Sequence, residues 1–139
     1  MLSSVLNLAQ RQVAEAHIAA IARRGDVRVR RTKEWTNSEA DTSSRQVFIP
    51  KTLHTALDYL VSLHELAHIL HRSATTTSYY EPSDGTCLRI EAAAWGWAID
   101  RALPEVLKAM TKTDWRRMGL CWASHAGHVW PNSRTGTLP

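Results

Sequence analysis

The chain has 139 residues, 44% of them hydrophobic, and a formal net charge of +4 at neutral pH. This length is enough for one domain with a modest core. The two cysteines, Cys87 and Cys121, have no CxxC spacing, which favours buried thiols in a reducing compartment over a disulfide framework. The N-terminal segment lacks a basic region and a long apolar run, so we expect no signal peptide, no membrane span and a cytoplasmic location.

The N-terminal part of the chain predicts a helix and then strands. Residues 3–24 have an amphipathic helical pattern. Its apolar side chains predict the inward face, namely Val5, Leu6, Ala9, Val13, Ala16, Ala20 and Ile21. Residues 26–31 alternate apolar and basic side chains, as in a strand with one solvent-exposed face. We expect a polar loop or hairpin over 33–45, with a short strand near Trp35, and a second strand over 46–49.

The central part of the chain predicts two buried helices. Residues 52–72 contain no Gly or Pro and have the apolar spacing of a buried helix, with Thr52 or Thr55 as the N-cap. After a polar connection over 73–86, residues 88–99 form an apolar, Ala-rich stretch that also predicts a helix.

The C-terminal part predicts a short helix over 104–110 and a last helix over 114–126, capped by Thr113. We therefore expect one α+β domain over residues 1–130, with a small mixed or antiparallel sheet, and a disordered tail over 131–139.

An HExxH run, from His64 to His68, occupies the last third of the predicted helix over 52–72. In a helix, residues four apart project from the same face, so His64 and His68 can reach one metal ion. Glu65 then lies beside the metal, where it can take a proton from a metal-bound water. This pattern is typical of zinc metallopeptidases.

Two histidines need a third ligand, and the fourth position stays open for water. The metzincin pattern requires a Gly and a third His where this chain has His71 and Ala74, which excludes that class. The predicted third ligand is Glu91, a lone acid in the apolar helix, because burying it unpaired would cost several kcal/mol. Glu81 and Asp84, in a turn, are rival ligands.

His71 lies on nearly the same side of the predicted helix as His64, one turn beyond His68. We expect it to line the cleft, bind substrate or hydrogen-bond a carboxylate. As a fourth protein ligand it would close the site and make the zinc structural.

The segments His64–His71 and Glu91–Ala98 resemble those of the ImmA/IrrE-type metallopeptidases, small bacterial and phage-borne zincins. The resemblance covers about residues 46–104, under half of the chain. It implies a compact, gluzincin-like minimal zincin fold with one zinc ion. It also implies proteolysis of a protein substrate, often a transcriptional regulator, in a bacterial or phage-infected cell.

Two positions depart from the patterns of these families. Ala67 stands where the ImmA/IrrE-type family often has a Gly, and Trp95 stands where thermolysin-like gluzincins place an Asp that orients a histidine. The partner of the His64 ring is therefore expected elsewhere, and the candidates are Asp58, Asp100 and a backbone carbonyl.

Two functions are compatible with the sequence. The first is a zinc endopeptidase in which Glu65 assists attack by the zinc-bound water. It needs a donor to the oxyanion, for which the candidates are Tyr79, Tyr80, His125 and His128. The alternative is a zincin-fold binding module that docks to a host protein or DNA without proteolysis. Such a module could be encoded by a phage. The intact general base favours the enzyme.

A basic segment surrounds the first predicted strand. Its members are Arg23, Arg24, Arg28, Arg30, Arg31 and Lys33. The charge is moderate, and no aromatic side chain is interleaved with it, so a solvated strand face is favoured over binding to an acidic protein partner or to DNA. The expected partner is a protein or peptide substrate.

Overall fold

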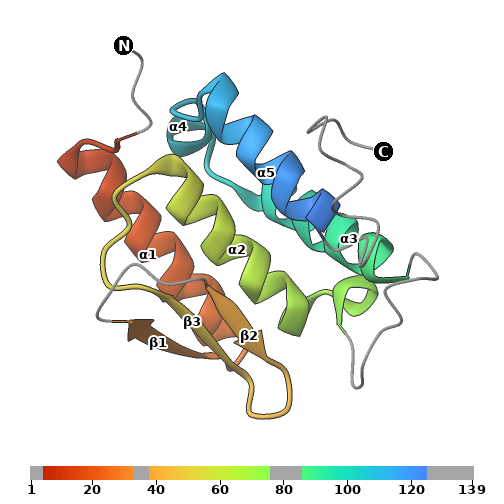
Figure 1. The fold of residues 1–139 in the computed structure, drawn as a ribbon. Coiled ribbons are helices and arrows are strands. Elements are labelled where there is room, and N and C mark those ends of the chain that lie inside the picture. Colours follow the sequence, from red (N-terminus) through yellow and green to blue (C-terminus); the bar gives the residue numbers. More distant parts are fainter. Residues whose placement is uncertain (1–4, 33–37, 76–85, 125–139) are drawn as a thin grey trace.

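The computed structural model describes residues 5–32, 38–75 and 86–124 (Figure 1). Within these ranges the protein is α+β, with five α-helices and a small mixed sheet of three strands. The elements in chain order are α1 (Leu8–Arg24), β1 (Arg28–Thr32), β2 (Glu39–Asp41), β3 (Gln46–Pro50), α2 (Ala56–Leu70), the 3-10 turn η1 (Arg72–Ala74), α3 (Thr86–Arg101), α4 (Pro104–Leu107) and α5 (Lys112–Ser124). The predictions for Trp35 and for residues 131–139 concern residues outside the described part.

Helix α1 begins at Leu8, later than predicted, because Asn7 and Gln10 form a capping box at its start. Its buried residues are Ala14, Ile18 and Ala22. The predicted inward face is wrong in large part, since Val13 is 38% exposed. Alanines lie on several sides of this helix, so its apolar pattern does not define one face, and packing against α2 and α4 selects it.

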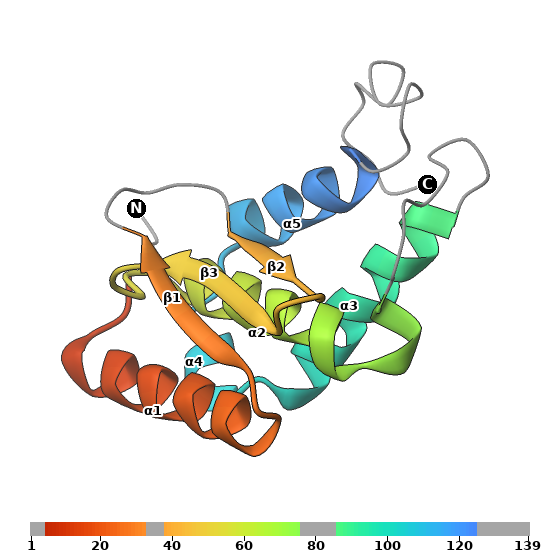
Figure 2. The same ribbon diagram turned by 90° about the horizontal axis from the view of Figure 1, so that it is seen from below.

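The sheet has the strand order β1–β3–β2 (Figure 2). Strand β3 pairs in parallel with β1 and antiparallel with β2, so the sheet is mixed. The buried side chains of Val47 and Ile49 alternate with the half-buried side chain of Phe48. Helices α1 and α2 contact the sheet and cover one of its faces.

Helix α2 is the centre of the molecule. The side chains of Thr55 and Asp58 form a capping box at its N-terminus, which confirms Thr55 as the N-cap. Neighbours on several sides leave Leu60, Leu63 and Leu66 without exposed surface. The helix lies between α1 and α3 and contacts the sheet, so a side chain on it can meet partners from several elements (Figure 1).

Helices α3 and α5 complete the core on the other side of α2. Ala94 and Ala98 of α3 are fully buried, and α3 lies closely against α2. At the start of α5, the Thr111 hydroxyl accepts from the Asp114 N–H, and the Asp114 carboxylate accepts from the Thr111 N–H. The predicted cap at Thr113 is therefore wrong by two residues.

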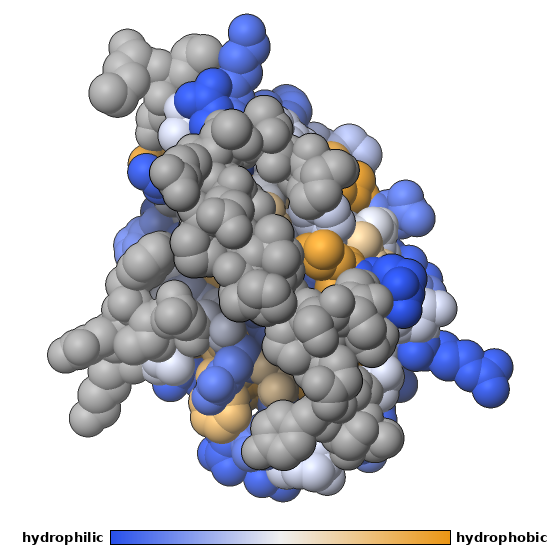
Figure 3. All heavy atoms as spheres, turned by 45° about the vertical axis from the view of Figure 1, so that its right-hand side comes forward, coloured by the Kyte–Doolittle hydropathy of each residue, from blue (hydrophilic) through white to orange (hydrophobic). Residues whose placement is uncertain are grey.

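The surface of the described residues mixes hydrophilic side chains with small hydrophobic areas, as on the face of the molecule shown in Figure 3. Cys121 is exposed on α5, so the expectation of a buried thiol is wrong for this cysteine. None of the helices in the described ranges has the length and apolar character needed to cross a bilayer.

Candidate metal centre

Two histidines of α2 project to the same point, as their spacing predicts. The Nε2 atoms of His64 and His68 lie 3.1 Å apart, and the two rings are nearly perpendicular, at 89°. His64 is only 3% exposed. Because both residues lie in the second half of a helix that the core surrounds, their side chains have little freedom to turn away.

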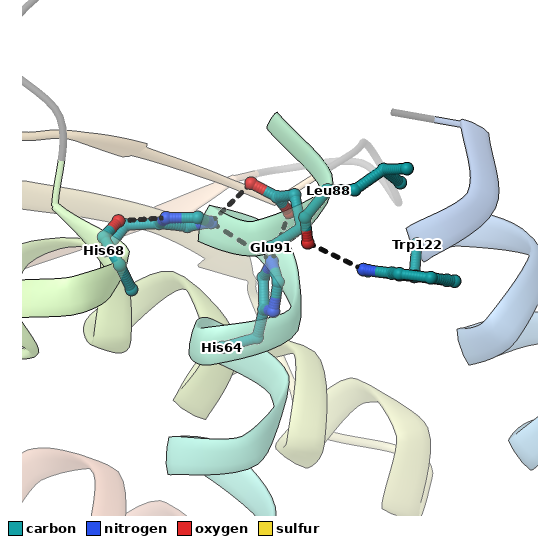
Figure 4. Close-up of polar contacts among 6 residues, drawn as sticks. His64, His68, Leu88, Glu91 and Trp122 are labelled. Atoms are coloured by element: carbon teal, nitrogen blue, oxygen red, sulfur yellow. Dashed lines mark hydrogen bonds and ion pairs between the residues drawn. The ribbon is translucent and has the colours of Figure 1, made fainter. Parts of the chain in front are cut away.

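Helix α3 brings Glu91 to the same point (Figure 4). One carboxylate oxygen of Glu91 lies 2.9 Å from His64 Nε2, and the other lies 3.0 Å from His68 Nε2. The ligand atoms of these three residues all lie within 4.8 Å of one another. The structure thus brings together the three predicted ligands as a group that is close enough to hold a metal ion.

The donor set suits a small divalent cation. In a tetrahedral zinc site, bonds of about 2.0–2.1 Å put neighbouring ligand atoms roughly 3.3 Å apart, close to the distances in this group. His68 Nδ1 lies 2.9 Å from the carbonyl oxygen of Ala74, which can only accept, so Nδ1 carries the hydrogen. In the neutral His68 ring, Nε2 therefore directs its lone pair at the Glu91 carboxylate. Because both groups are electron-rich, their contact is favourable only when a positive charge lies between them.

Without a metal ion, a proton supplies this charge. Burial disfavours the imidazolium form of His68, but hydrogen bonding to the Glu91 carboxylate outweighs it and raises the pKa of His68 to about 9. For Glu91, burial opposes ionisation, and the two histidines more than offset this and lower the pKa of its carboxyl. The group is therefore arranged around an ionised carboxylate.

Glu65 lies next to His64 on α2. It is not a member of the ligand group that the described residues form. Burial raises the pKa of Glu65 to about 8, His68 opposes the rise, and the negative charges of Glu91 and Glu39 add to it. In the metal-free protein Glu65 therefore keeps its proton to a higher pH than a solvent-exposed glutamate does. Glu39 belongs to the edge strand β2, which contacts α2.

The contact that His64 makes with Trp95 was not predicted. The two rings have centroids 4.0 Å apart and planes 35° from parallel. Of the suggested partners for His64, Asp58 uses its carboxylate to accept from backbone N–H groups at the start of α2, and Asp100 is exposed. A sequence signal did exist, since Trp95 follows Glu91 by four residues and so shares its face of α3.

A second tryptophan holds the helix that carries Glu91. Trp122 of α5 donates from Nε1 to the carbonyl oxygen of Leu88, at 2.8 Å (Figure 4). Leu88 lies less than one turn before Glu91, so this bond ties the start of α3 to α5. Sequence reasoning missed this role because it depends on how two distant helices pack.

The remaining candidates stay outside the group. His71 is the C-terminal cap of α2 and is half-buried; its backbone N–H donates to the Ala67 carbonyl. It is not among the described residues that could share the metal. The predicted rival ligands and oxyanion donors, Glu81, Asp84, Tyr79, Tyr80, His125 and His128, all lie outside the described residues.

Comparisons of the chain with models of protein families, with curated proteins and with solved structures find no match. The fold and the site therefore define the class of the protein: it is an α+β protein with a buried group of two histidines and one glutamate between two packed helices.

Proposed function

We propose that the protein is a zinc-dependent endopeptidase of the gluzincin-like, ImmA/IrrE type, with a minimal zincin fold. The observation that carries the proposal is the buried group of His64, His68 and Glu91, with Glu65 beside it on the same helix. Two imidazoles and one carboxylate form a common catalytic zinc set, which leaves a coordination position open.

In this proposal His64, His68 and Glu91 hold the metal, and Glu65 moves the proton. When bound, zinc lowers the pKa of a water molecule toward about 7 and polarises the scissile carbonyl. Glu65 accepts a proton from the attacking water and passes it to the leaving amine nitrogen. A bound divalent cation would lower the pKa of Glu65 from its metal-free value of about 8, which favours the ionised form that accepts the proton.

The edge strand β2 is the proposed place for the substrate backbone. It pairs with β3 on one side and contacts α2, the helix that carries the histidines. An extended peptide can add to such an edge through main-chain hydrogen bonds. The proposed substrate is therefore a protein segment in an extended conformation.

The first part of the test is the metal. The purified chain, stripped with a chelator and titrated with zinc against a competing chelator, should bind about one ion. Glu91→Ala should weaken binding by about a hundredfold or more, because it removes a ligand. Glu105→Ala, at an exposed acid of α4, is the matched control and should bind like the wild type. A wild-type chain that binds no zinc and gains no stability from it would contradict the proposal.

The second part separates an enzyme from a binding module. Glu65→Gln removes the proton acceptor and keeps the shape, so zinc affinity should stay within about threefold while cleavage is lost. Zinc-loaded wild type and variant are incubated with a complex peptide mixture, and new termini are counted by mass spectrometry. Cleavage by the wild type alone supports the proposal. Equal cleavage by both, or none by the zinc-loaded wild type, contradicts it and favours a docking role.

A further inference from the structure

Trp95 contacts a proposed metal ligand through the flat face of its ring. It lies on α3 one turn after Glu91, is 4% exposed, and its ring centroid is 4.0 Å from that of His64. The close packing of α2 on α3, where Ala94 and Ala98 are fully buried, keeps the two rings together. One helix therefore supplies both Glu91 and the side chain that contacts His64.

Each of the two histidines has a contact that limits rotation of its ring. His68 is fixed by a directional bond from Nδ1 to the Ala74 carbonyl. At His64 the indole of Trp95 lies against the imidazole, with the planes only 35° from parallel. Rotation of the His64 ring about its χ2 angle would drive its edge into the indole, so the contact restricts the direction of Nε2.

Trp95 belongs to the hydrophobic core, and it also buries a polar group there. The Nε1–H of Trp95 is buried, and no acceptor for it is found among the described residues. A buried N–H group requires an acceptor, a requirement that a phenylalanine or leucine at this position would not have. What the indole adds over those residues is a larger flat surface for the imidazole to lie against.

We propose that Trp95 is a positioning residue of the metal centre, which holds the His64 ring by ring contact so that Nε2 points at the metal. The inference rests on the proposed zinc site and deepens it. Trp95 stands where thermolysin-like gluzincins place an Asp that orients a histidine, and in this proposal it orients His64 through ring packing. Groups that orient a metal ligand typically change metal affinity about 10- to 100-fold when they are lost.

The test compares two tryptophans of the same helix. Trp95→Leu removes the ring contact, and Trp97→Leu is the matched control, because Trp97 is also buried, at 8% exposure, but contacts Arg101. Zinc affinity is measured by chelator competition on the folded fraction of each variant. Trp95→Leu should weaken zinc binding about tenfold or more, and Trp97→Leu should leave it within about threefold.

Two further readouts separate positioning from general destabilisation. The visible absorption of bound cobalt, which reports ligand geometry, should change in Trp95→Leu and not in Trp97→Leu. In the metal-free wild type, the His64 ring protons should show a ring-current shift in NMR spectra that Trp95→Leu abolishes. If the leucine variants do not fold, Trp95→Phe and Trp97→Phe give the same comparison, with a smaller loss confined to Trp95→Phe.

The outcomes distinguish this inference from the proposed function. Wild type that binds zinc, together with unchanged affinity and cobalt spectrum in the Trp95 variants, overturns the role of Trp95 and leaves the zinc site standing. Wild type that binds no zinc overturns both. Reduced affinity in the Trp95 variants, with normal affinity in the Trp97 variants, supports the inference.

Discussion

Glu65 and His68 have raised pKa values for different reasons. Burial favours the neutral carboxyl of Glu65. At His68 burial acts against the charged ring, and the Glu91 carboxylate overcomes it. In both cases the folded, metal-free chain binds protons more tightly than the unfolded chain. Stability of the metal-free protein must therefore fall where these protons are lost.

The pH dependence of unfolding follows with a definite sign. The pKa of His68 is raised from 6.5 to about 9, so its stabilising contribution is complete below pH 6.5 and is lost as pH rises toward 9. The free energy of unfolding of the metal-free protein should fall across this window, and loss of the Glu65 proton, whose pKa is about 8, should add to the fall. Urea titrations at several pH values measure it.

Glu91→Gln is the control for this prediction, because an uncharged amide no longer favours the imidazolium, and the slope should become flatter. The proton on His68 must also leave before a metal binds, so zinc affinity should rise over the same pH window. A metal-free wild type that becomes more stable from pH 6.5 to 9 would contradict this account of His68.

The grouping of the proposed ligands His64, His68 and Glu91 could be predicted from the sequence, and the contacts that hold them could not. The spacing of His64 and His68 is a property of one helix, and Glu91 was indicated by its isolation in an apolar stretch. The four-residue spacing places Trp95 on the same face of α3 as Glu91, but which ring of α2 the indole meets depends on how α2 and α3 pack. The proton-transfer role of Glu65 remains a prediction.

At the scale of elements, the helices of the described ranges were predicted, but their ends and faces were less accurate. Thr113 was the predicted cap of α5, whereas the Thr111 hydroxyl accepts from a backbone N–H three residues ahead. The predicted cap was displaced by two residues because both threonines precede the apolar pattern of the helix. The buried face of α1 failed for a related reason, since small alanines fit either side of a helix.

The cap of α5 can be tested by a matched pair of substitutions. Thr111→Ala removes the acceptor for the Asp114 N–H and should lower the free energy of unfolding by about 1 kcal/mol. Thr113→Ala, at an exposed position two residues along, should lower it by less than about half of that. Denaturant titration of both variants measures the difference, and a larger loss for Thr113→Ala would restore the original prediction.

At the scale of the whole molecule, the order of the strands was beyond local reasoning. Two strands were predicted at nearly the right residues, and the sheet was expected to be mixed or antiparallel. The parallel pairing of β1 with β3 places residues 18 positions apart side by side, as in Val29 and Val47. Such pairing depends on where α1 and α2 present their apolar faces, because the strands must cover them.

Among the described residues β1 lies at one edge of the sheet, where it can pair with a second molecule. An edge strand offers unpaired backbone groups to another molecule, and charged side chains discourage that pairing. Arg28 and Arg30 are both exposed on β1.

Replacing Arg28 and Arg30 with Thr, which keeps strand propensity, should produce association that grows with protein concentration, and light scattering measures it. Arg116→Thr with Arg117→Thr, exposed on α5, makes the same change in charge and should scatter like the wild type. Equal behaviour of the two double variants would mean that the arginines of β1 do not guard the edge. If the difference is found, the basic strand is explained by keeping copies of the chain apart, with no need for a nucleic-acid partner.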